Sequence, residues 1–265
     1  MNLQFTPFTD LRRALASVAQ LGSFLAVVFI ASHFIAWLAA ALVRSTVAAT
    51  VLPFAWLDRG DRLAALFELF HDNPAVLPVF LYATTISIVS GTALWTVLYP
   101  GLAHRLRAKA SFADLGAHCI RGLPAMVAQS CYGLGLRAAL GVPVVLVCVT
   151  LGLRGIALVP LWLVWTIATL AHDRARGSVV LYGAAAFDPR VLARSLSQVL
   201  SRPQLLVPGA GLTLLQVAMS AAVLLVALAG PYAFATTWIV RGLGAATLVV
   251  GLWRVALGLH DLERS

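Results

Sequence analysis

The amino-acid sequence predicts an all-α fold: a polytopic membrane helical bundle of about six transmembrane helices, forming one integral membrane domain over residues 1–265. The first observation is composition, because the chain is 61% hydrophobic and 11% charged, whereas soluble proteins are about 45–50% apolar and 25% charged. The second is that the apolar residues stand in runs long enough for a helix to cross about 30 Å of hydrocarbon. The third is that the arginines lie in short segments between these runs.

Six apolar runs are the predicted spans. They are residues 21–43, residues 75–99, one helix within 125–153, one within 155–171, and helices at about 205–229 and about 242–259. The first run is longer than the roughly 7–15 apolar residues of a signal peptide, so we expect it to be retained.

The distribution of positive charge predicts the orientation. The longest polar interruption of the C-terminal half, residues 172–204, has five arginines against two acids, and we expect a cytoplasmic loop there. On this topology, thirteen Lys and Arg residues are cytoplasmic and five are external. Residues 44–74, with four acids, are expected outside as an amphipathic helix. Both termini are then cytoplasmic, and the richness in Ala, Leu and Arg favours a bacterial inner membrane.

Three amphipathic helices are predicted on the inner leaflet. The first follows Asp10, a plausible N-cap; the second covers Ser111–Leu123; the third covers Asp188–Arg202, with Asp188 as N-cap and Pro189 at the first helical position. Each combines an apolar stripe with arginines, which are attracted to anionic lipid. We therefore expect anionic inner-leaflet lipids to be binding partners.

The sequence also indicates an internal repeat, with chance alignment of Leu- and Ala-rich segments as the alternative. The elements Arg154-Gly155, Trp165, His172-Asp173 and Arg176 recur at nearly equal intervals as Arg241-Gly242, Trp253, His260-Asp261 and Arg264. Each set follows a predicted amphipathic helix that begins near a Phe and an Asp. The pattern predicts parallel repeat units at residues 8–104, 111–176 and 187–264, of which the first is the weakest match.

One pattern carries a resemblance to a known group of proteins. An Asp-x-x-Arg, here Asp173 to Arg176, is followed by an Ala-rich amphipathic segment that ends in Arg-Pro, here Phe187 to Pro203. This resembles uncharacterised bacterial six-span membrane proteins that are similar to the non-catalytic membrane domain associated with glycerophosphodiester phosphodiesterases. The resemblance covers the C-terminal half and implies a fold and a lack of catalysis, but it assigns no functional residues.

The sequence offers no motif for catalysis. A membrane hydrolase needs a nucleophile with its base, or a metal motif such as His-Glu-x-x-His, and neither is present. The three cysteines have no metal-ligand spacing. We expect no enzyme activity, no cofactor, no metal and no disulfide. The formal charge of +9 is explained by the membrane rather than by nucleic acid, because the arginines form neither a basic tail nor one basic face.

The duplicated His-Asp pairs are the first candidate site. If the second and third repeat units pack as a pseudo-symmetric pair, His172, Asp173, His260 and Asp261 could meet as a metal or proton site. The alternative is that both pairs end their helices, with Asp173–Arg176 and Asp261–Arg264 as ion pairs three residues apart.

Two further residues are candidates because they are polar within predicted spans. His33 is either a hydrogen-bonded packing residue or a proton relay. Arg137 has two interpretations: if the third span begins near Ala138, it is shallow and extends its side chain toward water; if the span begins near Ala125, it lies in mid-bilayer. The deep interpretation makes Arg137 the anion-recognition residue of a lipid-handling site.

The expected function is correspondingly general. The sequence favours a non-catalytic scaffold, assembly factor or helper subunit, with a protein partner or a second copy of the chain. The alternative is a permease-like component that handles a lipid or a small amphiphile. A close-packed bundle with an apolar lateral face favours the first interpretation, and a continuous polar-lined cavity favours the second.

Overall fold

The computed structural model describes residues 7–19, 21–49, 71, 74, 76–107, 112–152, 158–229 and 234–263. Within these ranges all regular secondary structure is α-helical. The predicted all-α class is therefore confirmed. Most of the segment 44–74, the turn at Gly230-Pro231, and the residues Arg154 and Arg264 lie outside the described residues.

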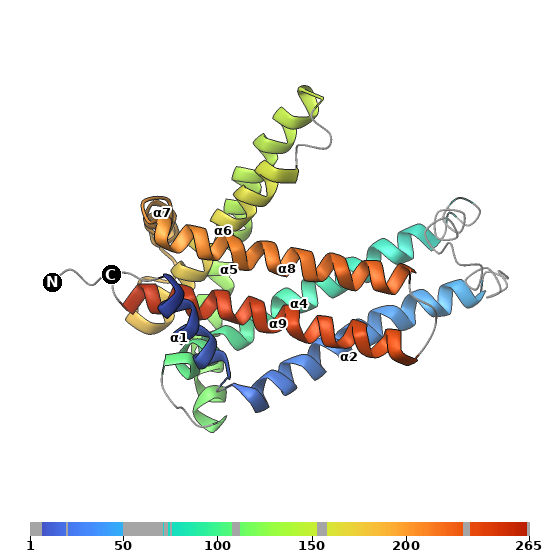
Figure 1. Cartoon of the computed structure of the whole chain (residues 1–265), viewed down its shortest axis with the longest axis horizontal. Coiled ribbons are helices and arrows are strands. Elements are labelled where there is room, and N and C mark those ends of the chain that lie inside the picture. Colours follow the sequence, from blue (N-terminus) through green and yellow to red (C-terminus); the bar gives the residue numbers. More distant parts are fainter. Residues whose placement is uncertain are drawn as a thin grey trace. The chain divides into compact units, whose positions relative to one another are not determined.

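The helices can be followed by colour in Figure 1. They are α1 (Pro7–Ala19), α2 (Gly22–Ala49), α4 (Val76–Arg107), α5 (Phe112–Thr150), α6 (Leu158–Tyr182), α7 (Pro189–Leu200), α8 (Pro203–Ala229) and α9 (Phe234–Glu263).

Several of these helices have the length and composition of membrane spans. Three described segments qualify, namely Asp114–Thr150, Pro203–Val223 and Trp238–Glu263. A fourth span is added if Leu11–Ala19 and Phe24–Ile35, which meet at a bend of 78°, are taken together. These helices indicate an integral membrane protein.

The chain divides into two compact units. Unit 1 comprises residues 1–22, 96–216 and 249–265, and unit 2 comprises residues 23–95 and 217–248. Within unit 2, hydroxyl groups bond to the backbone of their own helix: Ser32 Oγ donates to the carbonyl of Val28, and Thr85 Oγ1 donates to that of Leu81.

Helix α6 is central to unit 1. Residues 168–177 are all buried, and α6 packs on both α5 and α7. Glycines allow further helices to pack closely on α6. A Cβ atom at Gly209 of α8 would lie only 2.7 Å from the Leu170 side chain of α6. In the same way, a Cβ atom at Gly177 of α6 would lie 2.7 Å from Leu259 of α9. At these two positions the absence of a side chain lets the neighbouring helix approach α6 closely.

Residues 172–204, expected to form a polar loop, are mostly helical, so the loop prediction is wrong. Helix α6 continues through this sequence to Tyr182, only residues 183–188 lie between α6 and α7, and α8 begins at Pro203. Asp173, Arg174 and Arg176, which contributed to the loop prediction, are instead buried on α6, and distant segments of the chain supply their partners. Arg190 and Arg194 are exposed on α7.

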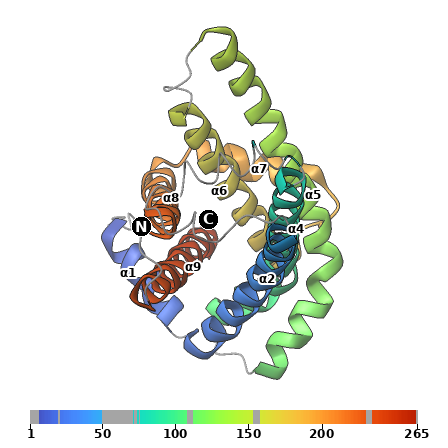
Figure 2. The ribbon, with the colours of Figure 1, turned by 90° about the vertical axis from the view of Figure 1, so that its right-hand side faces the viewer.

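The predicted second amphipathic helix, Ser111–Leu123, is not a separate element. Figure 2 shows α5 as one continuous helix, and it runs from Phe112 to Thr150. Pro124, which favours a boundary in sequence, lies inside it. The segment packs closely on α4, since a Cβ atom at Gly122 would lie 2.6 Å from the ring of Pro100.

Helix α7 begins as predicted. Asp188 is the N-cap, its Oδ1 accepts a hydrogen bond from the amide of Arg190 at 2.9 Å, and Pro189 takes the first turn. The buried side chains of α7 all lie on one face, which packs on α6. Because this apolar stripe is covered by protein, the outward face of α7 is the polar one, with Arg190 and Arg194 exposed.

Candidate functional site

Four ionisable side chains are buried in the middle of α6: His172, Asp173, Arg174 and Arg176. Successive residues of an α-helix are rotated by about 100°, so these side chains point to different neighbouring helices. They meet further charged residues from α5, α9 and the segment between α7 and α8. We call the whole set the α6 cluster; it comprises Arg137, His172, Asp173, Arg174, Arg176, Arg202, Arg254 and Asp261.

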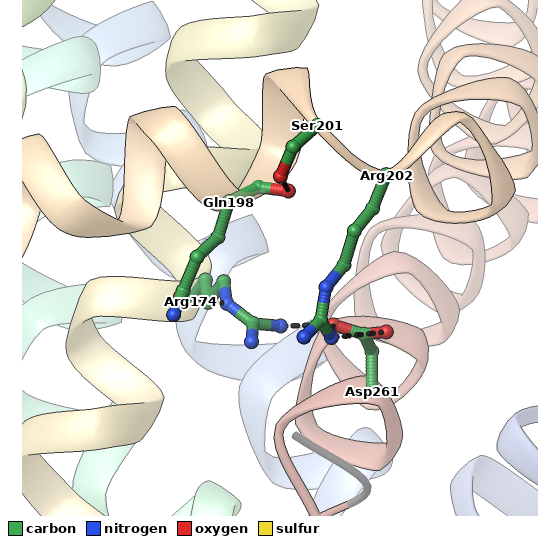
Figure 3. A network of polar contacts seen from close by, with 5 residues as sticks. All are labelled: Arg174, Gln198, Ser201, Arg202 and Asp261. Atoms are coloured by element: carbon green, nitrogen blue, oxygen red, sulfur yellow. Dashed lines mark hydrogen bonds and ion pairs between the residues drawn. The ribbon is translucent and has the colours of Figure 1, made fainter.

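The first part of the cluster joins α6, α7 and α9 (Figure 3). Arg174 forms an ion pair with Asp261, and its Nε donates to Oε1 of Gln198 at 2.8 Å. Arg202 Nη1 lies 3.2 Å from the same Asp261 carboxylate. The side chain of Arg174 is only 1% exposed and that of Asp261 is 15% exposed. The carboxylate is therefore shared by two guanidinium groups in a largely dehydrated environment.

The second part joins α6 to α8 and α9. Arg254 Nε donates to Asp173 Oδ2 at 3.1 Å, and its Nη1 donates to Oε1 of Gln216 at 2.7 Å. The phenol of Tyr99, on α4, donates to the backbone carbonyl of Asp173 at 2.8 Å. Asp173 thus contacts α4 and α9 directly, and Arg254 extends the network to α8.

The third part faces α4 and α5. Arg176 Nη2 donates to the hydroxyl groups of Ser130 and Thr96, and the guanidinium lies over the Tyr99 ring, 5.2 Å from its centroid. Within the described residues, Arg176 forms no ion pair with a carboxylate. A cation–π contact and hydroxyl acceptors stabilise a guanidinium but do not neutralise it.

The fourth part lies at the seam between α5 and α6. Arg137 Nη2 is 3.5 Å from Nδ1 of His172, and the Arg137 guanidinium lies over the ring of Trp165 at 5.0 Å from the centroid. The His172 ring packs against Gly133, where a Cβ atom would lie 2.6 Å from the ring. Gln129 Nε2 donates to the carbonyl of Ala186, which attaches the segment before α7 to α5.

Positive charge exceeds negative charge in the cluster. It contains five arginines and two aspartates, and each aspartate is already hydrogen-bonded to arginine. Buried charge is costly unless it is paired. The cluster can therefore hold helices together, and its surplus positive charge can attract an anion.

The two His-Asp pairs do not form a common site as predicted. Instead, each aspartate pairs with an arginine of the other helix. Asp173 of α6 pairs with Arg254 of α9, and Asp261 of α9 pairs with Arg174 of α6. Asp173 does not pair with Arg176, and His172-Asp173 does not end its helix, so both of those predictions are wrong. The continued helix turns Asp173 toward α9 instead. The predicted pair of Asp261 with Arg264 lies outside the described residues.

The other histidine candidates, His260 and His33, have hydrogen-bonding or ion-pair partners outside the α6 cluster. His260 lies near the end of α9, with Nε2 at 3.3 Å from Ser17 Oγ and Nδ1 at 3.5 Å from Glu263. His33 Nδ1 is 2.9 Å from the carbonyl of Phe29, which favours its interpretation as a packing residue. Within the described part of the chain, no group of three or more His, Cys, Asp or Glu side chains could hold a metal ion.

Arg137 lies far from both ends of its helix. No helix begins near Ala138, as one alternative required, because α5 is helical from Phe112 onward. Arg137 stands 13 residues before Thr150, the end of α5, or about 20 Å at 1.5 Å per residue. Its guanidinium is directed to α6 rather than along its own helix.

Several members and contacts of the cluster were not among the sequence-based candidates. Gln129, Gln198 and Gln216 each hydrogen-bond to the cluster or to the segment beside it. Gln129 and Gln216 carry a usable signal, since an isolated glutamine in an apolar run needs a hydrogen-bond partner. Arg174 and Arg254 carry no local signal, because their partners are distant in sequence.

A second polar contact lies between α4 and α5. The rings of His104 and His118 are stacked, with their centroids 3.7 Å apart. Burial lowers the pKa of His104 below its ordinary value, and the nearby His118 and Arg107 lower it further. His104 therefore prefers the neutral form.

Comparison with known proteins yields no relative. No family model matches the sequence, and no curated protein or solved structure matches it either.

Proposed function

We propose that this chain is a non-catalytic, multi-pass inner-membrane protein that serves as a scaffold, assembly factor or helper subunit. In this proposal the α6 cluster keeps the helices of unit 1 in one arrangement, and an outward stripe of α5 receives a transmembrane helix of a partner protein. The stripe is the observation that carries the proposal.

The stripe follows one face of α5 for five turns. Its exposed members are Cys131, Gly135, Ala138, Ala139, Val142, Leu146 and Val149. The first half has small residues, which let a second helix approach closely, and the second half has larger aliphatic residues that can pack around it. A membrane helix fits this combination better than lipid chains alone, since lipid needs no small residues.

The full membrane arrangement is part of the proposal. Helices α2, α4 and α6 contain 28, 32 and 25 residues, each more than the roughly 20 needed to cross a bilayer, and would complete six spans. Both termini would be cytoplasmic, with α1, the start of α5, and α7 near the inner leaflet. The cross-paired aspartates of α6 and α9 support the internal repeat and, with it, the resemblance to the six-span proteins.

Site-specific photocrosslinking in cells tests the partner surface. A photoreactive phenylalanine at Ala138, in the stripe, is compared with one at Leu214 of α8, an apolar position that is 54% exposed. We expect one defined protein adduct from position 138 and none from position 214. A second copy of the chain gives an adduct of twice its mass, and a different partner gives another mass. Lipid adducts alone from both positions would refute the proposal.

The alternative is a permease-like component that handles a lipid or small amphiphile. One observation favours it: Arg137 and Arg176, which form no ion pair with a carboxylate of the described residues, flank His172 at the α5–α6 seam. A transport assay with fluorescent phospholipid in reconstituted vesicles tests this alternative. Equal lipid movement with and without the protein would exclude it.

A further inference from the structure

The seam between α5 and α6 contains two positive charges that form no ion pair with a carboxylate of the described residues. The Asp173 carboxylate, which pairs with Arg254, acts on both charges only from a longer distance. Arg137 contacts His172 and Trp165, and Arg176 lies one turn beyond His172 on α6. Asp173 and Asp261 are hydrogen-bonded to Arg254, Arg174 and Arg202. A positive charge is costly within the hydrocarbon region, so an anion from outside the chain would stabilise this seam.

Unsatisfied donors are present at the same place. Nε of Arg137 and Nε of Arg176 are buried and have no hydrogen-bond partner among the residues that the structure describes. His172 Nε2 is also buried without a partner, but the ring is pressed against Gly133, which leaves no room for a ligand on that side. The groups that can receive an anion are therefore the guanidinium groups, which match phosphate oxygens in geometry.

The surroundings of Arg137 identify the kind of anion. The exposed residues beside it are apolar: Leu134 of α5 is 57% exposed and Trp165 of α6 is 53% exposed. A free inorganic anion gains nothing from such neighbours. A phosphate ester that carries acyl chains can place its headgroup on the guanidinium and its chains along these side chains.

The position along the helices agrees with this ligand. Arg137 is 13 residues before the end of α5, and His172 is 14 residues after the start of α6, so both lie about 20 Å from the turn that joins the two helices. In a hydrocarbon core of about 30 Å, that leaves about 10 Å to the other face. An extended arginine and a lipid phosphate drawn slightly inward can meet across this distance.

We propose that Arg137, with Arg176 behind it, forms a binding site for the phosphate group of an anionic phospholipid at the α5–α6 seam. The proposal rests on the proposed membrane orientation but not on the partner surface. Arg137 binds the phosphate directly. Arg176, held by Ser130 and Thr96, adds a second fixed positive charge.

Native mass spectrometry of the full-length protein from mild detergent tests the site. Variants Arg137→Gln and Arg241→Gln are compared with wild type. Arg241 is a matched control, because it is also an arginine over a tryptophan ring, at 5.6 Å from the centroid of Trp238 on α9. We expect wild type and Arg241→Gln to retain one phospholipid each. Retention by Arg137→Gln should be about tenfold lower, as expected for loss of a charge-assisted contact. Equal retention by all three proteins overturns the proposal.

A second measurement needs only the wild-type protein. After exchange into nanodiscs with equal amounts of phosphatidylglycerol and phosphatidylcholine, we expect the retained lipid to be phosphatidylglycerol in clear excess. Equal retention of the two lipids overturns the proposal.

Inorganic phosphate is titrated into delipidated protein in parallel. A shift of the unfolding temperature by phosphate without lipid retention would identify a free phosphate site and overturn the lipid version. None of these outcomes depends on the photocrosslinking result.

Discussion

At the scale of residues, the cluster depends on how two carboxylates are distributed among arginines. Asp261 forms ion pairs with Arg174 and Arg202, while Asp173 forms one with Arg254. The Arg174–Asp261 and Arg254–Asp173 pairs are largely buried, so the attraction within each pair mainly offsets the cost of dehydrating its charges. Removal of one member is therefore expected to be far more damaging than removal of an exposed ion pair.

The variant Asp261→Asn tests this expectation. It keeps the shape of the side chain but removes the charge beside Arg174, and we expect the free energy of unfolding to fall by about 3–5 kcal/mol. Glu263→Gln is the matched control, because the Arg107–Glu263 side chains are 44% and 36% exposed and such pairs contribute about 0–1 kcal/mol. Unfolding in mixed detergent and dodecyl sulfate micelles measures both variants. Equal losses would show that Asp261 does not stabilise buried charge.

The stacked pair of His104 and His118 predicts a dependence of stability on pH. Burial and the neighbouring cationic groups lower the pKa of His104 in the folded protein below its ordinary value of 6.5. The unfolded chain then binds the proton more readily, so stability is fully present above about pH 6.5 and is lost as the pH falls below it. We expect the unfolding temperature of the wild type to fall more between pH 7 and pH 5 than that of His104→Gln. Parallel curves for the two proteins would contradict this.

At the scale of elements, contact between helices is set by glycines on their facing sides. Gly133 of α5 faces the His172 ring of α6, whereas a Cβ atom at Gly135 would have nothing within 4 Å. Two glycines on one turn of α5 thus have opposite surroundings. The same substitution should therefore have opposite effects at the two positions.

The pair Gly133→Ala and Gly135→Ala tests the packing of α5 on α6. A methyl group at residue 133 would lie 2.6 Å from the ring atoms, and such overpacking typically costs about 1–3 kcal/mol. At residue 135 the methyl group meets open space, so its higher helix propensity should leave stability unchanged or raise it by up to about 1 kcal/mol. Unfolding of both variants under the same conditions gives the comparison. A loss at residue 135 as large as that at residue 133 would contradict the helix contact.

The elements that sequence predicts correctly are those with local causes. Asp188 and Pro189 specify the start of α7 through their own backbone and side-chain chemistry, and the long apolar runs specify helices. The continuation of α6 through His172 to Arg176 could not be predicted in this way. Four ionisable residues in a row of five indicate solvent unless their partners are known, and Asp261 and Arg254 are about 80 residues away. Likewise, Pro124 marks a boundary in sequence, but packing against α4 keeps α5 continuous.

At the scale of the whole molecule, the aspartates and arginines of α6 and α9 pair with each other across the two helices. Each helix supplies one aspartate, Asp173 on α6 and Asp261 on α9, and each aspartate pairs with an arginine of the other helix. Both partners must then lie at the same level of the membrane. The orientation of the chain therefore determines on which side the α6 cluster and its proposed lipid site lie.

Cysteine labelling in sealed cells tests that orientation. The background is Cys131→Ser, because Cys131 is exposed while Cys119 and Cys148 are buried. Leu151→Cys places a thiol in the turn after α5, and Ser265→Cys places one at the C-terminus. Since arginine-rich segments stay in the cytoplasm, we expect an impermeant maleimide to modify residue 151 in intact cells and residue 265 only after lysis. Modification of residue 265 in intact cells would reverse the orientation or change the number of spans. In a reversed chain, the surplus arginines of the α6 cluster would face the outer leaflet instead.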